Sequence, residues 1–149
     1  TIFVFVADHG AALDNLYDMS LSYHHTPLLF YSPNLIKNYK TFDNIAGQID
    51  IYPTIMGQLQ LSYNNNTLGI DLLKENRPYI YFNADNKYGV LDSTWFLIAR
   101  DDNTLELYKY REKDKHNYVN EAKDIAEKMN IYAKSNLQTY QYLLKKKKL

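Results

Sequence analysis

The feature that most constrains this chain is an apolar run that ends abruptly in a polar turn. Residues 1–6 read TIFVFV, a β-branched and aromatic run without polar alternation, which predicts a strand buried on both faces of a parallel sheet. The run stops at Ala7-Asp8-His9-Gly10. Ligands of open α/β sheets bind beyond the carboxyl ends of the strands. Asp8 and His9 therefore follow the strand where chemistry is normally placed.

An adjacent carboxylate and imidazole permit two interpretations on the residues alone. Together they can bind a divalent cation, because the carboxylate supplies charge and the neutral imidazole supplies a borderline-soft nitrogen. Alternatively, Asp8 caps the following turn and His9 is half-buried beside it, as is common at strand ends. Both interpretations remain open at this point.

The next segments predict a loop, a second strand and a helix. Residues 10–23 are polar and predict a loop with one helical turn that borders the site. Residues 27–31 form a second apolar run, stopped by Ser32-Pro33-Asn34. Asp50 is placed to cap a helix that has Pro53 in its first turn. Its predicted apolar face consists of Ile51, Ile55, Met56 and Leu59.

The second half of the chain has a different pattern. Four strand-like runs are separated by turn clusters at residues 83–86, 92–93 and 101–103, which predicts an antiparallel sheet. Apolar residues then recur in steps of three and four over residues 118–144. This spacing predicts one amphipathic helix that packs on the sheet, with a possible break at residues 135–136. The lysines of residues 145–148 predict a solvated tail, with contact to an anionic lipid surface as the alternative.

Composition excludes several classes of function. The 149 residues suit one domain, and 17 basic against 17 acidic side chains give no field that would attract nucleic acid. Cysteine is absent, which excludes thiolate metal sites. No run approaches the roughly 20 apolar residues of a membrane span. Because the first residue already lies inside a strand, we expect the carboxyl-terminal part of a longer protein, with any anchor upstream.

Several motifs resemble, in order, those of the alkaline phosphatase superfamily, which includes sulfatases and lipoteichoic acid synthases. Residues 5–10 are similar to its (T/S/A)-D-H-G metal motif, and residues 25–33 resemble its H-x-P-L strand. Residues 48–56 resemble its D-I-x-P-T-L helix start, and residues 68–73 its G-x-S/D-L turn. The resemblance implies an α/β fold with a small antiparallel sheet and a long C-terminal helix. Residues 1–76 would be the core part and residues 77–149 the sheet and helix.

The resemblance also implies roles for individual residues. Asp8 and His9 would bind a divalent metal (Mn2+ or Zn2+, with Ca2+ or Mg2+ as alternatives), which activates a hydroxyl nucleophile. His25 would contact the transferred group or the leaving oxygen, or bind a metal in two-metal relatives. His24 competes for that role, and we expect only one of the two in the site because strand neighbours point to opposite faces. Asp50 and Asp71 match structural positions.

The differences between this sequence and the motifs of each group indicate which branch of the superfamily it resembles most. No lysine or arginine occurs in residues 1–30, whereas sulfatases place a sulfate-binding lysine between D-H-G and the next strand. The short acidic loop that ends in His-x-Pro is most similar to lipoteichoic acid synthases. We therefore predict an extracytoplasmic, membrane-anchored transferase that moves a phosphoglycerol-type lipid headgroup to a glycan or lipid acceptor. Its nucleophile would lie upstream, so the fragment alone would be inactive. The alternatives are a sulfuric ester hydrolase and a non-catalytic sulfatase-fold binding domain.

Overall fold

The computed structural model describes residues 1–13 and 16–146. Two compact units are present, Thr1–Asp43 and Asn44–Leu149. The last residues of the lysine run, Lys147 and Lys148, lie outside the described part of the chain. Whether the whole chain is one portion of a single catalytic domain, divided near residue 77, stays a prediction.

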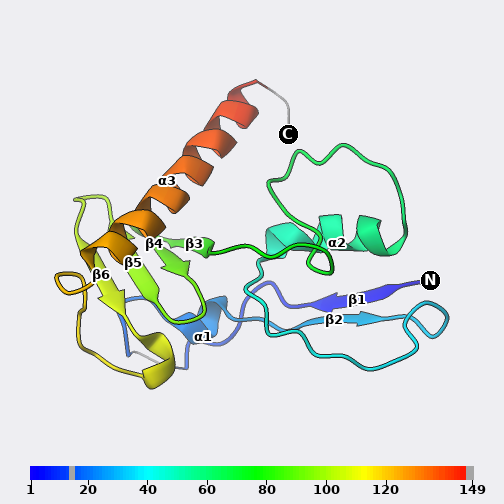
Figure 1. The fold of residues 1–149 in the computed structure, drawn as a ribbon, viewed down its shortest axis with the longest axis horizontal. Coiled ribbons are helices and arrows are strands. Elements are labelled where there is room, and N and C mark those ends of the chain that lie inside the picture. The colour runs from blue at the N-terminus through cyan, green and yellow to red at the C-terminus, as the bar shows by residue number, and fades with distance from the viewer. Residues whose placement is uncertain (14–15, 147–149) are drawn as a thin grey trace. The chain divides into compact units, whose positions relative to one another are not determined.

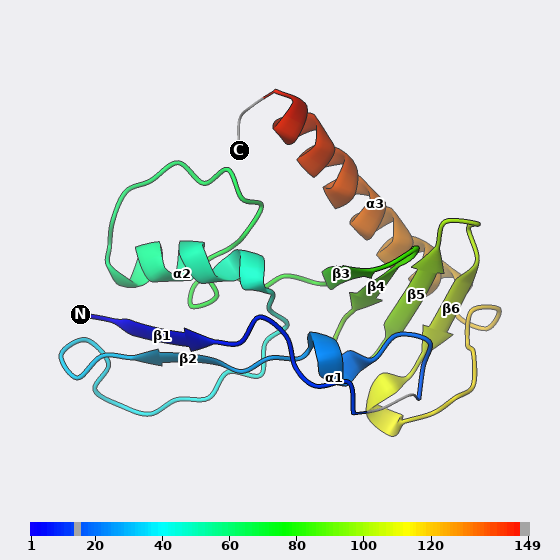
Figure 2. The ribbon, with the colours of Figure 1, turned by 180° about the vertical axis from the view of Figure 1, so that it is seen from behind.

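The first unit contains a pair of short strands and one turn of helix. Strand β1 pairs with β2 in the antiparallel direction, with Phe3 opposite Tyr31 and Val6 opposite Leu28 (Figure 2). The helical turn α1 lies in the connection between them, as the polar loop predicted. The bounds of these elements are β1 Phe3–Val6, α1 Leu21–His24 and β2 Leu28–Tyr31.

The prediction that the first run is a buried strand of a parallel sheet is wrong for this structure. The connection folds back and returns the chain beside β1 in the opposite direction, which gives antiparallel pairing. The side chains that share one face of the pair are about half exposed, at 48% for Phe3, 55% for Phe5, 54% for Leu29 and 53% for Tyr31. An unbroken apolar run predicts a strand, but it does not specify what covers the strand.

The second unit contains a four-stranded antiparallel sheet, as predicted (Figure 1). Its strands follow in chain order, because each is joined to the next by a short turn. Asp85 and Asn103 adopt positive φ angles of 52° and 67° in two of these turns, a conformation that Asp and Asn tolerate better than most residues. The strands are β3 Ile80–Ala84, β4 Lys87–Leu91, β5 Phe96–Arg100 and β6 Leu105–Tyr108.

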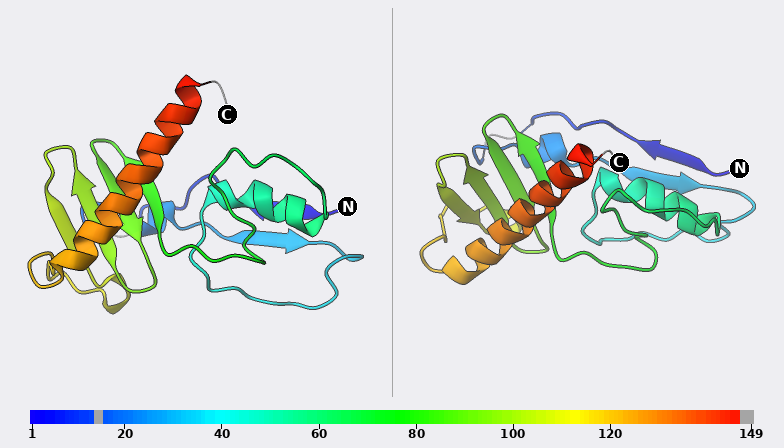
Figure 3. Two further views of the ribbon diagram at one scale, coloured as in Figure 1. Left: turned by 45° about the horizontal axis from the view of Figure 1, so that its top comes forward. Right: turned by 90° about the horizontal axis from the view of Figure 1, so that it is seen from above.

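The long helix α3, Lys123–Lys145, lies across one face of this sheet (Figure 3). It is continuous through residues 135–136, and it begins five residues later than predicted. The delay has a local cause. The Tyr118 carbonyl accepts from the Ala122 N–H at 2.9 Å in a single turn, and the non-helical backbone angles of Ala122, φ −128° and ψ 46°, separate this turn from the helix. A short 3-10 turn, Tyr110–Glu112, follows β6. The buried core between sheet and helix is Val90, Leu97, Leu107, Ala126, Met129 and Ala133.

The helix α2, Ile51–Gln58, follows a 3-10 turn at Gln48–Asp50, close to the predicted start. Its most buried residues are Pro53 and Thr54, and not the predicted apolar face. The reason is polar, because the Thr54 hydroxyl donates to the Asp50 carbonyl at 2.7 Å and accepts from the Leu72 N–H at 3.1 Å. The bond to Leu72 holds this side of the helix against the turn that follows the loop.

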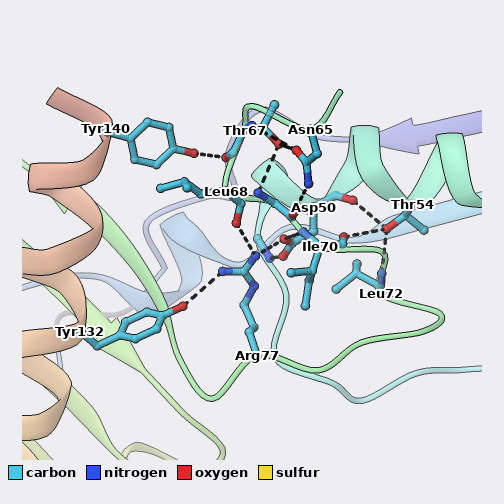
Figure 4. A network of polar contacts seen from close by, with 12 residues as sticks. Asp50, Thr54, Asn65, Thr67, Leu68, Ile70, Leu72, Arg77, Tyr132 and Tyr140 are labelled. Carbon is cyan, nitrogen blue, oxygen red and sulfur yellow. Dashed lines mark hydrogen bonds and ion pairs between the residues drawn. The ribbon is translucent and has the colours of Figure 1, made fainter. Parts of the chain in front are cut away.

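The Asp50 carboxylate does not cap α2 through its side chain, contrary to prediction. One oxygen accepts from the Gly47 N–H at 2.9 Å, and the other accepts from the Ile70 N–H at 2.9 Å and pairs with the Arg77 guanidinium (Figure 4). The side chain of Asp50 is fully buried and that of Arg77 is 5% exposed. Arg77 also donates to the Tyr132 hydroxyl of α3 at 3.4 Å. The pair thus joins α2, the following loop and α3.

Asp71 occupies the turn that follows this loop, as its motif implied. Its carboxylate accepts from the Leu73 N–H at 3.1 Å, and its carbonyl accepts from the Lys74 N–H at 3.0 Å. Gly57 is in close contact with it, since a Cβ there would lie 2.0 Å from an Asp71 carboxylate oxygen. Asp71 therefore has a structural role.

Truncating a side chain in the core below α3 should destabilise the fold. We expect Met129→Ala to lower the free energy of unfolding by about 2–5 kcal/mol, because the side chain is fully buried and would leave a cavity. Ile131→Ala, on the same helix but 63% exposed, should change it by less than about 0.5 kcal/mol. Urea unfolding followed by circular dichroism measures both, and equal losses would contradict the assigned core.

Removing the Arg77 charge should be similarly costly. Arg77→Met leaves the buried Asp50 carboxylate without its cation, which we expect to cost about 3–5 kcal/mol of unfolding free energy. The matched control is Lys123→Met, since Lys123 pairs with Glu127 at 3.8 Å on the surface and such pairs contribute at most about 1 kcal/mol. If both variants have the same urea midpoint, the buried pair does not have this role.

Candidate metal-binding site

Asp8 and His9 lie just beyond β1 with their side chains turned toward each other. The His9 backbone N–H donates to Oδ1 of Asp8 at 2.9 Å, which fixes that carboxylate. The second carboxylate oxygen, Oδ2, is 3.8 Å from Nε2 of His9. Both side chains are accessible, at 90% exposure for Asp8 and 51% for His9. An anionic oxygen and a ring nitrogen therefore converge at an open surface.

The hydrogen bond of the other His9 nitrogen determines the tautomer of the ring. Nδ1 lies 2.8 Å from the Gly10 carbonyl oxygen. A carbonyl oxygen can only accept, so Nδ1 carries the proton in the neutral ring and Nε2 keeps its lone pair. A histidine that binds a metal through Nε2 is commonly oriented in this way by a backbone carbonyl at Nδ1. The nitrogen that faces Asp8 is thus the one suited to bind a cation.

Gly10 allows the turn after His9 to approach the segment around α1. Its N–H donates to the Tyr23 carbonyl at 2.7 Å. A Cβ at this position would lie 2.2 Å from the Ser22 carbonyl oxygen and 3.0 Å from that of His25. Only a residue without a side chain fits so close to another backbone. This contact holds the Asp8-His9 turn beside the segment that carries His24 and His25.

The two candidate histidines are not strand neighbours, so the argument that strand geometry admits only one of them does not apply. His24 is the last residue of α1, and His25 is its extended C-cap. His24 is partly buried, and burial lowers the pKa of its imidazole. His25 is exposed, and its carbonyl faces Gly10. The choice between them for a catalytic role stays a prediction.

Tyr23 is a residue of this site that the sequence reasoning missed. Its ring stacks on the His9 imidazole, with centroids 4.6 Å apart and planes inclined by 18°. Its other neighbour is His24, which it meets edge-on at 5.3 Å. The available signal was an aromatic residue directly before the histidine pair, but only the folded loop shows that Tyr23 contacts both His9 and His24.

The donor set fits a divalent cation in part. The separation of 3.8 Å between Oδ2 and Nε2 is shorter than the sum of a Zn–O and a Zn–N bond, about 4.2 Å, so one ion can contact both atoms. The described residues contain no group of three or more His, Cys, Asp or Glu side chains that could hold an ion. Asp8 and His9 thus supply two ligands, and a complete site needs more.

The family comparison agrees with the motif resemblance. Residues 1–61 match the family model described as Sulfatase, a segment that includes the Asp8-His9 turn, both candidate histidines and α2. A search of curated proteins found no match. The match covers less than half of the chain and makes this segment similar to sulfatases. It gives no support to lipoteichoic acid synthases in particular.

Solved structures share the fold of this chain. BT4656, crystallised with its substrate D-glucosamine-2-N,6-O-disulfate, has a TM-score of 0.71 at 18% identity and covers 94% of this chain. Ps i-CgsB has a TM-score of 0.68 at 18% identity over 90% of this chain. An alkaline phosphatase superfamily protein from Vibrio parahaemolyticus has a TM-score of 0.64 at 20% identity over 76%.

These likenesses define the fold of the chain. The matched regions make up 34%, 36% and 28% of those three proteins, respectively, so this chain spans about a third of their length. It has the fold of part of a sulfatase-like α/β protein, with antiparallel sheets and a long helix, as the motifs implied.

The burial of His24 predicts a pH effect in the metal-free protein. Because burial lowers its pKa below 6.5, the unfolded chain binds more protons than the folded chain between the two pKa values, so stability rises with pH there. We expect the ring protons of His24 to titrate below pH 6.5 by NMR. We also expect His24→Gln to lose less stability than the parent between pH 8 and pH 5.5. A midpoint at or above 6.5 would contradict this assignment.

Proposed function

We propose that this chain supplies two metal ligands, Asp8 and His9, to the active site of a sulfatase-like enzyme that cleaves sulfate esters. The convergence of Oδ2 and Nε2 at 3.8 Å, within the segment that matches the sulfatase family, is the observation that carries the proposal. Two of the structurally similar proteins were crystallised with a sulfated sugar or with a neocarrahexaose. A sulfated saccharide is accordingly the substrate class we propose.

A divalent cation bound there would act as a Lewis acid, lowering the pKa of a hydroxyl nucleophile and offsetting charge on the attacked ester. The residues of this chain have simpler tasks. Asp8 supplies the negative charge, and His9 supplies the nitrogen whose orientation the Gly10 carbonyl fixes. His24 or His25 would contact the transferred group or the leaving oxygen. We propose that the nucleophile and the remaining ligands come from other parts of the full-length protein.

A second candidate is the transfer of a phosphoglycerol-type headgroup from a lipid to a glycan or lipid acceptor. It is favoured by the absence of lysine and arginine from residues 1–30, where a sulfatase carries a sulfate-binding cation. The extracytoplasmic, membrane-anchored location belongs to this candidate. Among the described residues, no helix has the length and apolar character needed to cross a bilayer.

Metal content tests the shared part of both candidates. In the full-length protein, we expect Asp8→Ala to weaken Zn2+ or Mn2+ binding by more than about 10-fold, because loss of outer partners alone costs about 10- to 100-fold. Asp43→Ala, which removes an exposed carboxylate of the same unit, should leave binding unchanged. Isothermal titration and elemental analysis measure both variants. Equal metal content in the parent and Asp8→Ala would overturn the metal site.

The two candidates are separated by their substrates. Turnover of an aryl sulfate by the metal-loaded parent, lost in Asp8→Ala, would support the ester hydrolase. Release of glycerol phosphate from phosphatidylglycerol, with no turnover of the sulfate, would support the transferase instead.

A further inference from the structure

We propose that Tyr23 is a positioning residue that holds the His9 imidazole in its metal-binding orientation. This inference rests on the proposed function, because it concerns the same two ligands. The face of the aromatic ring orients the imidazole, and the hydroxyl group of Tyr23 has no part in this.

Both backbone groups of Tyr23 are hydrogen-bonded, which fixes the point from which its side chain extends. Its N–H donates to the hydroxyl of Ser20, the N-cap of α1, at 3.4 Å. Its carbonyl accepts from the Gly10 N–H at 2.7 Å. Tyr23 is therefore tied at one end to the start of its own helix and at the other to the turn after His9. These bonds hold the Tyr23 backbone beside the turn after His9, and its ring stacks on the imidazole although Tyr23 is 39% exposed.

The ring of His9 is constrained by two contacts that act in different directions. The Nδ1 bond to the Gly10 carbonyl fixes the edge of the ring. The stack with Tyr23 fixes its plane, with centroids 4.6 Å apart. Together they direct Nε2 toward Oδ2 of Asp8. At 51% exposure, a histidine without the second contact would keep several rotamers, and ordering it would cost part of the binding free energy.

The contact also sets what each substitution should do. Phenylalanine keeps the flat face of the ring, so Tyr23→Phe should bind Zn2+ within about twofold of the parent. Leucine keeps an apolar side chain without that face, so Tyr23→Leu should bind about 10-fold more weakly, as for other lost partners of metal-binding histidines. The matched control is Tyr39→Leu, since Tyr39 is 92% exposed and its hydroxyl contacts Thr41. That variant should bind like the parent.

The experiment is a Zn2+ titration of the metal-free, full-length parent and of Asp8→Ala, Tyr23→Phe, Tyr23→Leu and Tyr39→Leu by calorimetry. NMR of the unsubstituted protein adds a readout that does not depend on folding of any variant. The ring protons of His9 should be shifted upfield by Tyr23, and its nitrogen shifts should report a proton on Nδ1. Tyr23→Phe should keep both signatures, and Tyr23→Leu should lose the upfield shift.

The outcomes distinguish this inference from the proposed function. If the parent and Asp8→Ala bind Zn2+ equally, the metal site itself is wrong. If Asp8→Ala loses binding while Tyr23→Leu binds like the parent, only the role of Tyr23 is overturned. The same conclusion follows if Tyr23→Phe is as weak as Tyr23→Leu, or if the His9 protons of the parent show no upfield shift.

Discussion

The larger unit depends on one buried negative charge. The carboxylate of Asp50 is out of contact with water, and such a charge is tolerated only when hydrogen bonds and a counter-ion replace its hydration. The Gly47 and Ile70 amides and the Arg77 guanidinium supply them. Gly47 precedes α2, Ile70 follows the loop after α2, and Arg77 precedes β3. Because all three bind the same carboxylate, the course of the chain between them is fixed. Tyr132 connects the same pair to α3.

The first unit is organised by backbone contact. Gly10 meets the backbone of Ser22 and His25 so closely that any side chain would collide. This approach lets a short turn hold Asp8 and His9 next to α1, where Tyr23 lies against the imidazole. The site is consequently built by contacts between residues 8–10 and residues 20–25. The orientation of the His9 ring depends on its neighbours, whereas the ability to bind a cation comes from the Asp8 and His9 side chains themselves.

Much of the fold could be predicted from the pattern of residues. The alternation and turn residues of the second half located β3 to β6, because short antiparallel strands joined by tight turns are encoded locally. The period of apolar residues located α3, although the non-helical backbone of Ala122 separates the predicted first turn from the helix. The burial of β1 and the buried side of α2 could not be predicted, since both depend on partners distant in the sequence.

The candidate site divides in the same way. The sequence by itself determined the pair Asp8-His9 and its place after a strand, because these follow from adjacent residues, whereas the need for glycine at position 10 comes from its contact with the Ser22 and His25 backbones. Only the tertiary structure decided that Oδ2 and Nε2 converge, which nitrogen of His9 carries the proton, and that Tyr23 stacks on the ring. Those properties arise from contacts between residues 8–10 and residues 20–25. Such contacts depend on the path of the loop between the two segments, and the residues of either segment do not specify that path.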